Sequence, residues 1–184
     1  MKLAVLLLLA AVSGAAALDL RAIVMEAQGE GGKYTYLEFR DRGKPVTYMP
    51  PTGWKFHGRA EALSFTVAET VGVEIDIRRQ ELDVPLSMDE SDGRAFERLA
   101  RQSLPGDATK VELLGREANP LRIDGRATVE FTFQYVIFGS PVRVSQLYLT
   151  RGYELLCFRV VARPADFARL HRTFRQSLHS FDGL

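Results

Sequence analysis

The side chains that could do chemistry are few and lie far apart in the sequence. Histidine occurs three times, at His57, His171 and His179, and no G-x-S-x-G pattern is present to carry a serine nucleophile. A Ser–His–acid site needs a serine beside a histidine that an acid orients. His171 and His179 are eight positions apart, too far to share a metal as an i, i+4 pair does. We therefore expect all three histidines to be structural or solvated, and we predict no catalytic residue.

The remaining reactive groups also favour a structural role. Cys157, the single cysteine, lies in the apolar run Leu155–Phe158, where a buried thiol is inert. One cysteine excludes a disulfide within the chain, although a disulfide between two chains remains an alternative. The sequence has no Cys pair, His-x-x-x-His or calcium loop, so we expect no metal and no cofactor. Glu74 and Asp76 share a strand face, and we expect them to face water rather than form a catalytic pair.

Binding residues are the other possibility. Arg169, Arg172 and Arg175 recur at three-residue steps, which makes them neighbours on a helix. Such a face is ordinarily solvated, and the alternative is that it binds an anionic partner. Trp54, the only tryptophan, follows Pro50–Pro51 and either closes one end of the core or anchors a partner. If the protein binds a partner, we expect Trp54, Arg169 and Arg172 to contact it.

Composition sets the class of protein that must position these residues. The chain has 184 residues, of which 46% are hydrophobic and 26% charged, as in an ordinary globular protein of one domain. Its formal net charge is +1, from 24 basic and 23 acidic residues. A balanced charge gives no reason to expect nucleic acid as a partner.

The N-terminus has the layout of a secretory signal peptide. Lys2 precedes the apolar run Leu3–Val12, and Ala15-Ala16-Ala17 supplies small residues for a peptidase. An uncleaved anchor is the alternative, but a spanning helix needs about 20 apolar residues. We predict a cleaved signal peptide over 1–17 and a mature form that does not span the membrane. That form, which lacks Lys2, has 23 basic and 23 acidic residues and is secreted or periplasmic.

Alternation with period two predicts most of the mature chain to be strands. Residues 18–33 form an N-terminal spacer or a short strand, and residues 34–184 form the single domain. The clearest strand is Val129–Tyr135, in which apolar residues alternate with Glu130, Thr132 and Gln134. With the two strands that follow it, this segment predicts a meander. The predicted strands cover 34–39, 45–49, 62–68, 71–78, 110–116, 129–135, 142–150 and 153–162.

Two helices interrupt the strands. Ser91 or Asp92 can cap the first, which runs to about Leu104 before Pro105-Gly106. Pro164 suits the first turn of the second. The second helix repeats apolar residues at three- and four-residue steps, at Phe167, Leu170, Phe174 and Leu178. The element order predicts an α+β fold, a central antiparallel sheet covered by two main helices.

Three sequence features resemble the PsbP-like superfamily. They are Tyr48-x-Pro50-Pro51-x-Gly53-Trp54, the single helix Ser91–Leu104 between two sets of strands, and the ending Phe174-x-x-Ser177-x-x-Ser180-Phe181. Together these features span roughly residues 45–182. The resemblance implies helices packed on a central antiparallel sheet, in domains that mostly act as binding or assembly subunits. It implies no functional residue here, because the sequence shows no metal-binding constellation to match the photosynthetic members.

These observations favour a non-enzymatic exported binding or assembly module. Its partner would be an unknown protein or small ligand of the cell envelope, and we expect no nucleic acid. The alternatives are a small secreted hydrolase with an unrecognised site and a carrier of a small ligand between sheet and helix. A histidine beside a nucleophile or carboxylate in a cleft would favour the hydrolase, and an apolar pocket would favour the carrier.

Overall fold

The computed structural model describes residues 17–29, 32–88 and 92–184. Of the predicted signal peptide, all but Ala17 lies outside these residues. The α+β class and the antiparallel pairing predicted from the sequence are both confirmed. The bounds of the strands and helices in chain order are β1 Asp19–Gly29, β2 Gly32–Asp41, β3 Lys44–Tyr48, β4 Lys55–Arg59, β5 Ala62–Thr66, β6 Glu74–Glu81, α1 Gly93–Gln102, β7 Thr109–Ala118, β8 Val129–Ile137, β9 Ser140–Arg151, β10 Glu154–Ala162, α2 Pro164–Ser177 and the 3-10 turn Leu178–Ser180.

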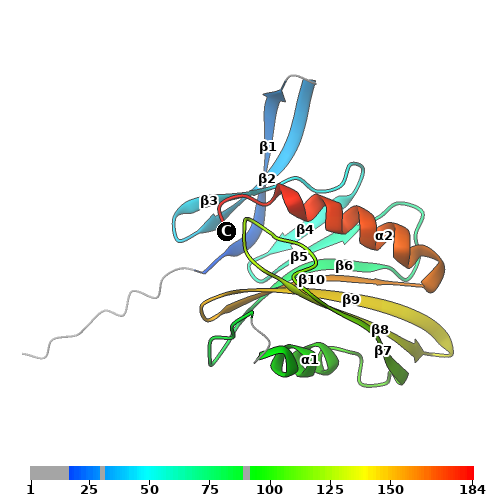
Figure 1. Cartoon of the computed structure of the whole chain (residues 1–184). Helices are drawn as coiled ribbons and strands as arrows, with labels where there is room; N and C mark the ends of the chain where they lie inside the picture. The colour runs from blue at the N-terminus through cyan, green and yellow to red at the C-terminus, as the bar shows by residue number, and fades with distance from the viewer. Residues whose placement is uncertain (1–16, 30–31, 89–91) are drawn as a thin grey trace, which may run out of the picture.

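A seven-stranded sheet with the order β4-β5-β6-β10-β9-β8-β7 forms the centre of the molecule. The predicted meander is confirmed, since β8 pairs with β9 and β9 with β10, each through a tight turn. Helix α2 lies on one face of this sheet and α1 on the other (Figure 1). Consecutive residues of one strand therefore pack into different cores. In β10, for example, Phe158 belongs to the core under α2 and Cys157 packs against the core under α1.

The core under α2 is the larger one. Phe167, Leu170 and Phe174 of the helix are buried against strands β5, β6, β9 and β10. Pro164 stands in the first turn of α2, as predicted. On the opposite face, Phe96 and Ala100 of α1 pack against Phe131 and neighbouring residues of the meander.

A second, three-stranded sheet was not predicted as a separate layer. Its order is β1-β2-β3, and it closes the end of the α2 core with buried Phe39, Val46 and Tyr48. Tyr48 Oη lies 2.7 Å from Ser177 Oγ, and Thr47 bridges to Asp182, so the C-terminus ties this sheet to α2. The cover on this face is therefore α2 plus a small sheet, a correction to the prediction of two covering helices alone.

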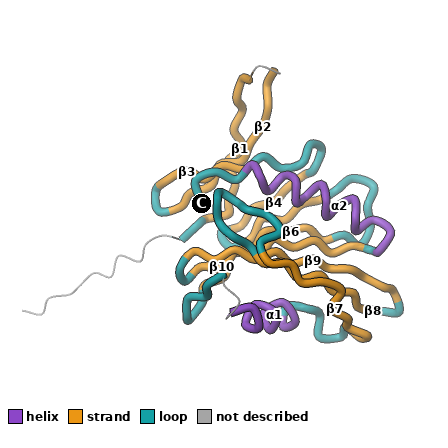
Figure 2. The backbone as a smooth tube through the Cα atoms, in the orientation of Figure 1, coloured by secondary structure: helices purple, strands orange, loops and turns teal. Residues whose placement is uncertain are grey.

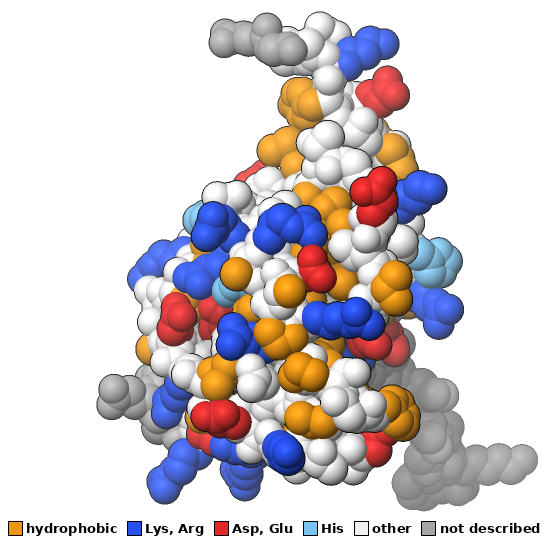
Figure 3. Space-filling view, turned by 90° about the vertical axis from the view of Figure 1, so that its right-hand side faces the viewer, with side chains coloured by type: hydrophobic (Ala, Val, Ile, Leu, Met, Phe, Trp, Pro, Cys, Tyr) orange, Lys and Arg blue, Asp and Glu red, His pale blue; other side chains and the backbone are white. Residues whose placement is uncertain are grey.

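The segment 18–33, predicted as a spacer or short strand, contains strand β1 of 11 residues. Near its start β1 crosses β4, and Leu20 N–H donates to the oxygen of Ala60, in the turn after β4, at 3.1 Å. The β1–β2 hairpin projects from the body (Figure 1). Figure 3 shows this arm at the top, with apolar side chains along it and charged side chains of both signs over the body below.

Candidate functional site: a basic groove beside α2

A groove of about 880 Å³ lies between α2 and the loop that joins β7 to β8. Figure 2 shows this loop running close to the C-terminal half of α2. Of the residues that the structure describes, four arginines and two histidines line the groove, and no carboxylate does. The lining residues are Asn119, Pro120, Leu121, Arg122, Arg143, Phe167, Ala168, His171, Arg172, Arg175, Gln176 and His179.

A buried carboxylate holds the groove in shape from below. Glu130 of β8 is only 3% exposed, and its Oε1 lies 2.6 Å from His171 Nε2 and accepts a hydrogen bond from Ser145 Oγ. Its other oxygen lies 3.2 Å from Arg175 Nη1. Burial acts to raise the pKa of Glu130, but the hydrogen bonds from His171 and Ser145, together with the nearby charge of Arg175, outweigh it and the pKa is lowered. Glu130 is therefore ionised and satisfied in the folded protein.

Arg175 joins this carboxylate to the opposite wall. Its Nη2 donates to Pro120 O at 2.6 Å while its Nη1 pairs with Glu130. The wall is also held internally, because Asn119 N–H donates to Thr128 O at 2.7 Å and the Thr128 hydroxyl bonds Leu121 O. Hydrogen bonds thus link Glu130 of β8, helix α2 and the loop between β7 and β8. The groove is therefore formed by contacts within the protein itself.

For Glu130 and Arg175, the sequence pattern predicted exposure to water, and this prediction was wrong. Glu130 alternates with the apolar residues of β8, and Arg175 lies among the arginines predicted to be solvated. The structure turns this side of β8 toward α2, which buries Glu130 and half-buries Arg175. The i, i+4 spacing of His171 and Arg175 was the available signal, since it places both side chains on one face of a helix.

Three arginines of the groove keep uncompensated charge. Arg122, Arg143 and Arg172 form no ion pair within 4 Å in the described part of the chain, whereas Arg175 is paired. Arg143 Nε donates to the neutral Gln134 side chain at 3.0 Å, and Arg122 Nη1 to the Gly125 carbonyl at 3.0 Å. Guanidinium groups that are free of carboxylates bind anions in paired, planar geometry.

The structure separates the residues predicted to bind a partner. Arg172 is exposed and lines the groove. Arg169 lies outside it, turned further round α2, and its Nη2 is 3.5 Å from Asp166 Oδ1. Trp54 is half-buried, stacked on Phe174 with ring centroids 6.2 Å apart and edge-on to Phe65. It closes the end of the α2 core, which is one of the two interpretations offered by the sequence.

The other reactive residues lie apart from the groove or contribute no nucleophile. His57 is exposed on β4, and burial raises the pKa of the Cys157 thiol to about 12. Ser145 bonds the carboxylate of Glu130 rather than His171, so the three residues do not form a Ser–His–acid relay. Among the described residues, the lining of the groove includes no Ser, Thr or Cys. Its three arginines without carboxylate partners make the groove suited to an anion.

Asp76 corrects one prediction. Its side chain was expected to face water beside Glu74, but it is 4% exposed and bound by Arg78 at 2.8 Å. Arg159 Nη1 lies 3.5 Å from its other oxygen. Desolvation raises the pKa of Asp76 despite these two cations. This cluster is an internal ion network on the side of the sheet that faces α1, and Glu74 remains exposed there.

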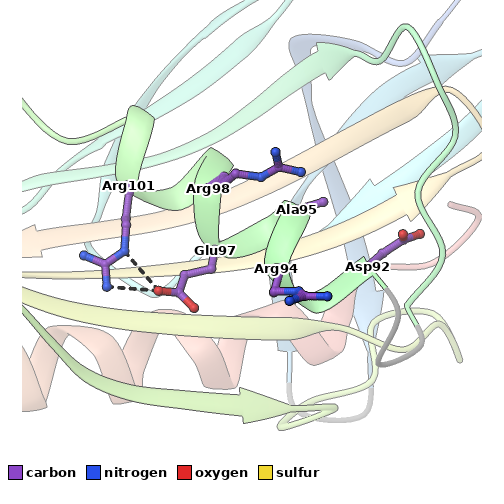
Figure 4. A pocket seen from close by; sticks show the side chains of 6 residues that line it. All are labelled: Asp92, Arg94, Ala95, Glu97, Arg98 and Arg101. Atoms are coloured by element: carbon purple, nitrogen blue, oxygen red, sulfur yellow. Dashed lines mark hydrogen bonds and ion pairs between the residues drawn. The ribbon is translucent and has the colours of Figure 1, made fainter.

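A second hollow of about 630 Å³ lies along the outer side of α1. Figure 4 shows its charged side chains, which extend from this one helix, and the hydrogen bond that Arg101 donates to Glu97. Every lining residue in the described part of the chain belongs to α1 or its N-cap. The groove beside α2 joins three elements and is the better candidate site. No group of three or more His, Cys, Asp or Glu residues that could hold a metal occurs in the described ranges.

Comparison with solved structures identifies the fold. The chain matches the solution structure of the cyanobacterial PsbP protein of Synechocystis with a TM-score of 0.54 and 14% identity, over 94% of this chain and 96% of that one. It also matches a protein of unknown function from Pseudomonas aeruginosa with a TM-score of 0.50 and 15% identity, over 88% of this chain and 97% of that one. No family model and no curated protein matches the sequence. At this level of identity the likeness concerns fold, and the resemblance predicted from the sequence motifs is confirmed: this protein has the PsbP-like fold.

Proposed function

We propose that this protein is an exported, non-enzymatic binding or assembly module, and that the groove beside α2 captures an acidic peptide segment of a protein partner. The observation that carries this proposal is the set of three arginines, Arg122, Arg143 and Arg172, which converge on one preformed groove without carboxylate partners. An acidic segment would supply the missing charge.

The shape of the groove favours a peptide. From Phe167 to Gln176 the groove follows ten residues of α2, and the nine rises of 1.5 Å between them span about 14 Å. An extended peptide of about four residues covers that length. The side-chain amides of Asn119 and Gln176 offer both a donor and an acceptor, as a peptide backbone requires.

The same lining argues against nucleic acid. Binding of single strands relies on exposed aromatic rings on which bases stack. Within the described ranges, Phe167 is the only aromatic side chain of the groove besides the histidines, and it is 6% exposed and stacks with His171. Pro120 and Ala168 at the walls suit the apolar parts of a peptide instead.

Export remains part of the proposal. It is supported by the signal-peptide pattern of residues 1–17 and by the paucity of thiols. Within the described residues, no helix is long and apolar enough to cross a bilayer. We propose a secreted or periplasmic location for the mature form.

Peptide binding tests the groove directly. A fluorescent peptide rich in Asp and Glu should bind the mature protein, and Arg172→Ala should weaken binding about tenfold or more, the usual effect of losing a hydrogen bond to a charged group. Arg169→Ala is the matched control, since Arg169 is exposed on the same helix but outside the groove and paired with Asp166. Equal losses in the two variants, or no binding to the wild-type protein, would overturn the proposal.

We also propose that Trp54 contacts the partner, although it lies outside the groove. Its half-exposed ring adjoins the α2 core, so Trp54→Ala should reduce both stability and capture if it serves both roles. Circular dichroism on the same variant separates the two effects. Loss of stability with unchanged affinity would leave Trp54 a core residue only.

One observation favours the hydrolase as a second candidate. A histidine paired with a buried carboxylate, as His171 is with Glu130, can act as a general base toward water. Purified protein should then turn over an ester, peptide or glycoside substrate, and His171→Gln should abolish turnover. The carrier is not favoured, because the groove is open and lined mainly by charged and polar side chains.

A further inference from the structure

Leu18, the residue that follows the predicted cleavage point, is buried in the α2 core. Leu18 is 1% exposed and belongs to the α2 core, and Leu20 is fully buried there. Ala17 is only half-buried and lines a small hollow of about 190 Å³ beside Glu154. Cleavage one residue further into the chain would remove Leu18 from the core.

The backbone nitrogen of Leu18 meets a buried carboxylate. It donates to Glu154 Oε1 at 3.2 Å, and Glu154 is 7% exposed. The other oxygen of Glu154 accepts from Arg151 Nε at 3.0 Å. Arg79 Nη1 lies 3.7 Å from Oε1, beyond hydrogen-bond distance. In the described ranges, the Leu18 nitrogen is thus the one group hydrogen-bonded to Oε1.

We infer that the chain is processed between Ala17 and Leu18, and that the new α-ammonium of Leu18 forms a buried ion pair with Glu154. A signal peptidase would hydrolyse the Ala17–Leu18 peptide bond with one water molecule. The hydroxyl of the water goes to the Ala17 carboxyl group, and Leu18 leaves as an amine that is protonated. This inference rests on the proposed export and is independent of the groove.

Two independent observations lead to the same bond. The small residues of Ala15-Ala16-Ala17 place the cleavage after Ala17, and in the structure the next residue, Leu18, is buried in the core with its nitrogen on Glu154. Cleavage turns a neutral N–H donor into a cation at a position that already faces a carboxylate. Hydrogen bonds between two charged groups are stronger than those with a neutral donor. An extra residue would move the charge about 3.8 Å along the chain.

Mass spectrometry of the exported protein should find Leu18 as its first residue. Four purified proteins then test the ion pair: chains that start at Leu18 or at Ala17, each with and without Glu154→Gln. The Leu18 start should melt about 2–4 °C higher than the Ala17 start, and Glu154→Gln should remove that difference. Glu81→Gln is the matched control, because Glu81 lines the same hollow but does not bond Leu18.

A second comparison keeps the test valid if Glu154→Gln unfolds the protein. An acetyl group on the Leu18 start removes the charge without altering Glu154 and should lower the melting temperature by the same amount. A different N-terminus in the exported protein, or equal melting of the acetylated and free forms, would overturn the inference. The acidic-peptide assay on the same proteins reports on the groove separately, so failure of one proposal is distinguished from failure of the other.

Discussion

At the scale of single residues, the buried side of α2 carries stability and its outer side carries recognition. Phe174 is 2% exposed and contacts the rings of Trp54 and Phe65, whereas Arg172 has no ion pair in the described residues. A residue with few contacts in the folded protein is free to serve a ligand. The two substitutions should therefore separate stability from binding.

Phe174→Ala should lower the free energy of unfolding by about 3–5 kcal/mol, the usual range for truncating a core phenylalanine. Arg172→Ala should change it by less than about 0.5 kcal/mol, as at other exposed positions. Urea unfolding of both variants measures the difference. Similar effects of the two substitutions would show that α2 is not docked through Phe174.

Glu130 should make stability depend on acid pH. Because its pKa is lower in the folded than in the unfolded protein, its contribution is complete above the ordinary glutamate range, about 4.3. The contribution is lost as pH falls through the lower folded pKa. Glu130→Gln should thus be less stable than the wild type at pH 7, and the gap should narrow on acidification.

Urea unfolding between pH 7 and pH 3 measures this gap. Glu117→Gln is the control, since Glu117 is 61% exposed at 3.7 Å from the same Arg175 and should have little effect. A gap between the wild type and Glu130→Gln that stays constant over the whole pH range would contradict the assignment.

At the scale of elements, the close crossing of β1 over β4 joins the two sheets. A Cβ on Gly58 would lie 2.4 Å from the Leu20 carbonyl oxygen and 2.9 Å from the Ala22 nitrogen. Both atoms are backbone, so no side chain can turn away to make room. Only glycine lets β1 approach β4 this closely.

Gly58→Ala should therefore displace β1 and destabilise the protein by more than about 1 kcal/mol, since strain of this kind falls among the larger point-mutation effects. Gly115→Ala is a matched control in strand β7, where a Cβ would meet no atom within 4 Å. Thermal melting of both variants decides the point. If Gly58→Ala is as well tolerated as Gly115→Ala, the two sheets are not held by this crossing.

At the scale of the whole molecule, stability comes from two cores on the faces of one sheet, and each is lined by apolar side chains. Chelator treatment should leave the melting temperature unchanged, because no metal-ligand spacing occurs in the sequence. Differential scanning calorimetry with and without the chelator measures this. A fall of several degrees would indicate that a metal site holds the fold.

The sequence by itself determined the elements that have their own periodicity. Local patterns of hydrophobic residues predicted the strands 129–135, 142–150 and 153–162 and the apolar stripe of α2. The order of these elements then predicted the α+β class. Local motifs also predicted the PsbP-like fold. The covering three-stranded sheet, the burial of Asp76 and Glu130 and the half-burial of Arg175 were decided only by tertiary structure. The physical reason is that alternation along a strand shows only which residues share a face of the sheet. Whether a polar face is buried depends on which distant element supplies opposite charges and hydrogen bonds to it.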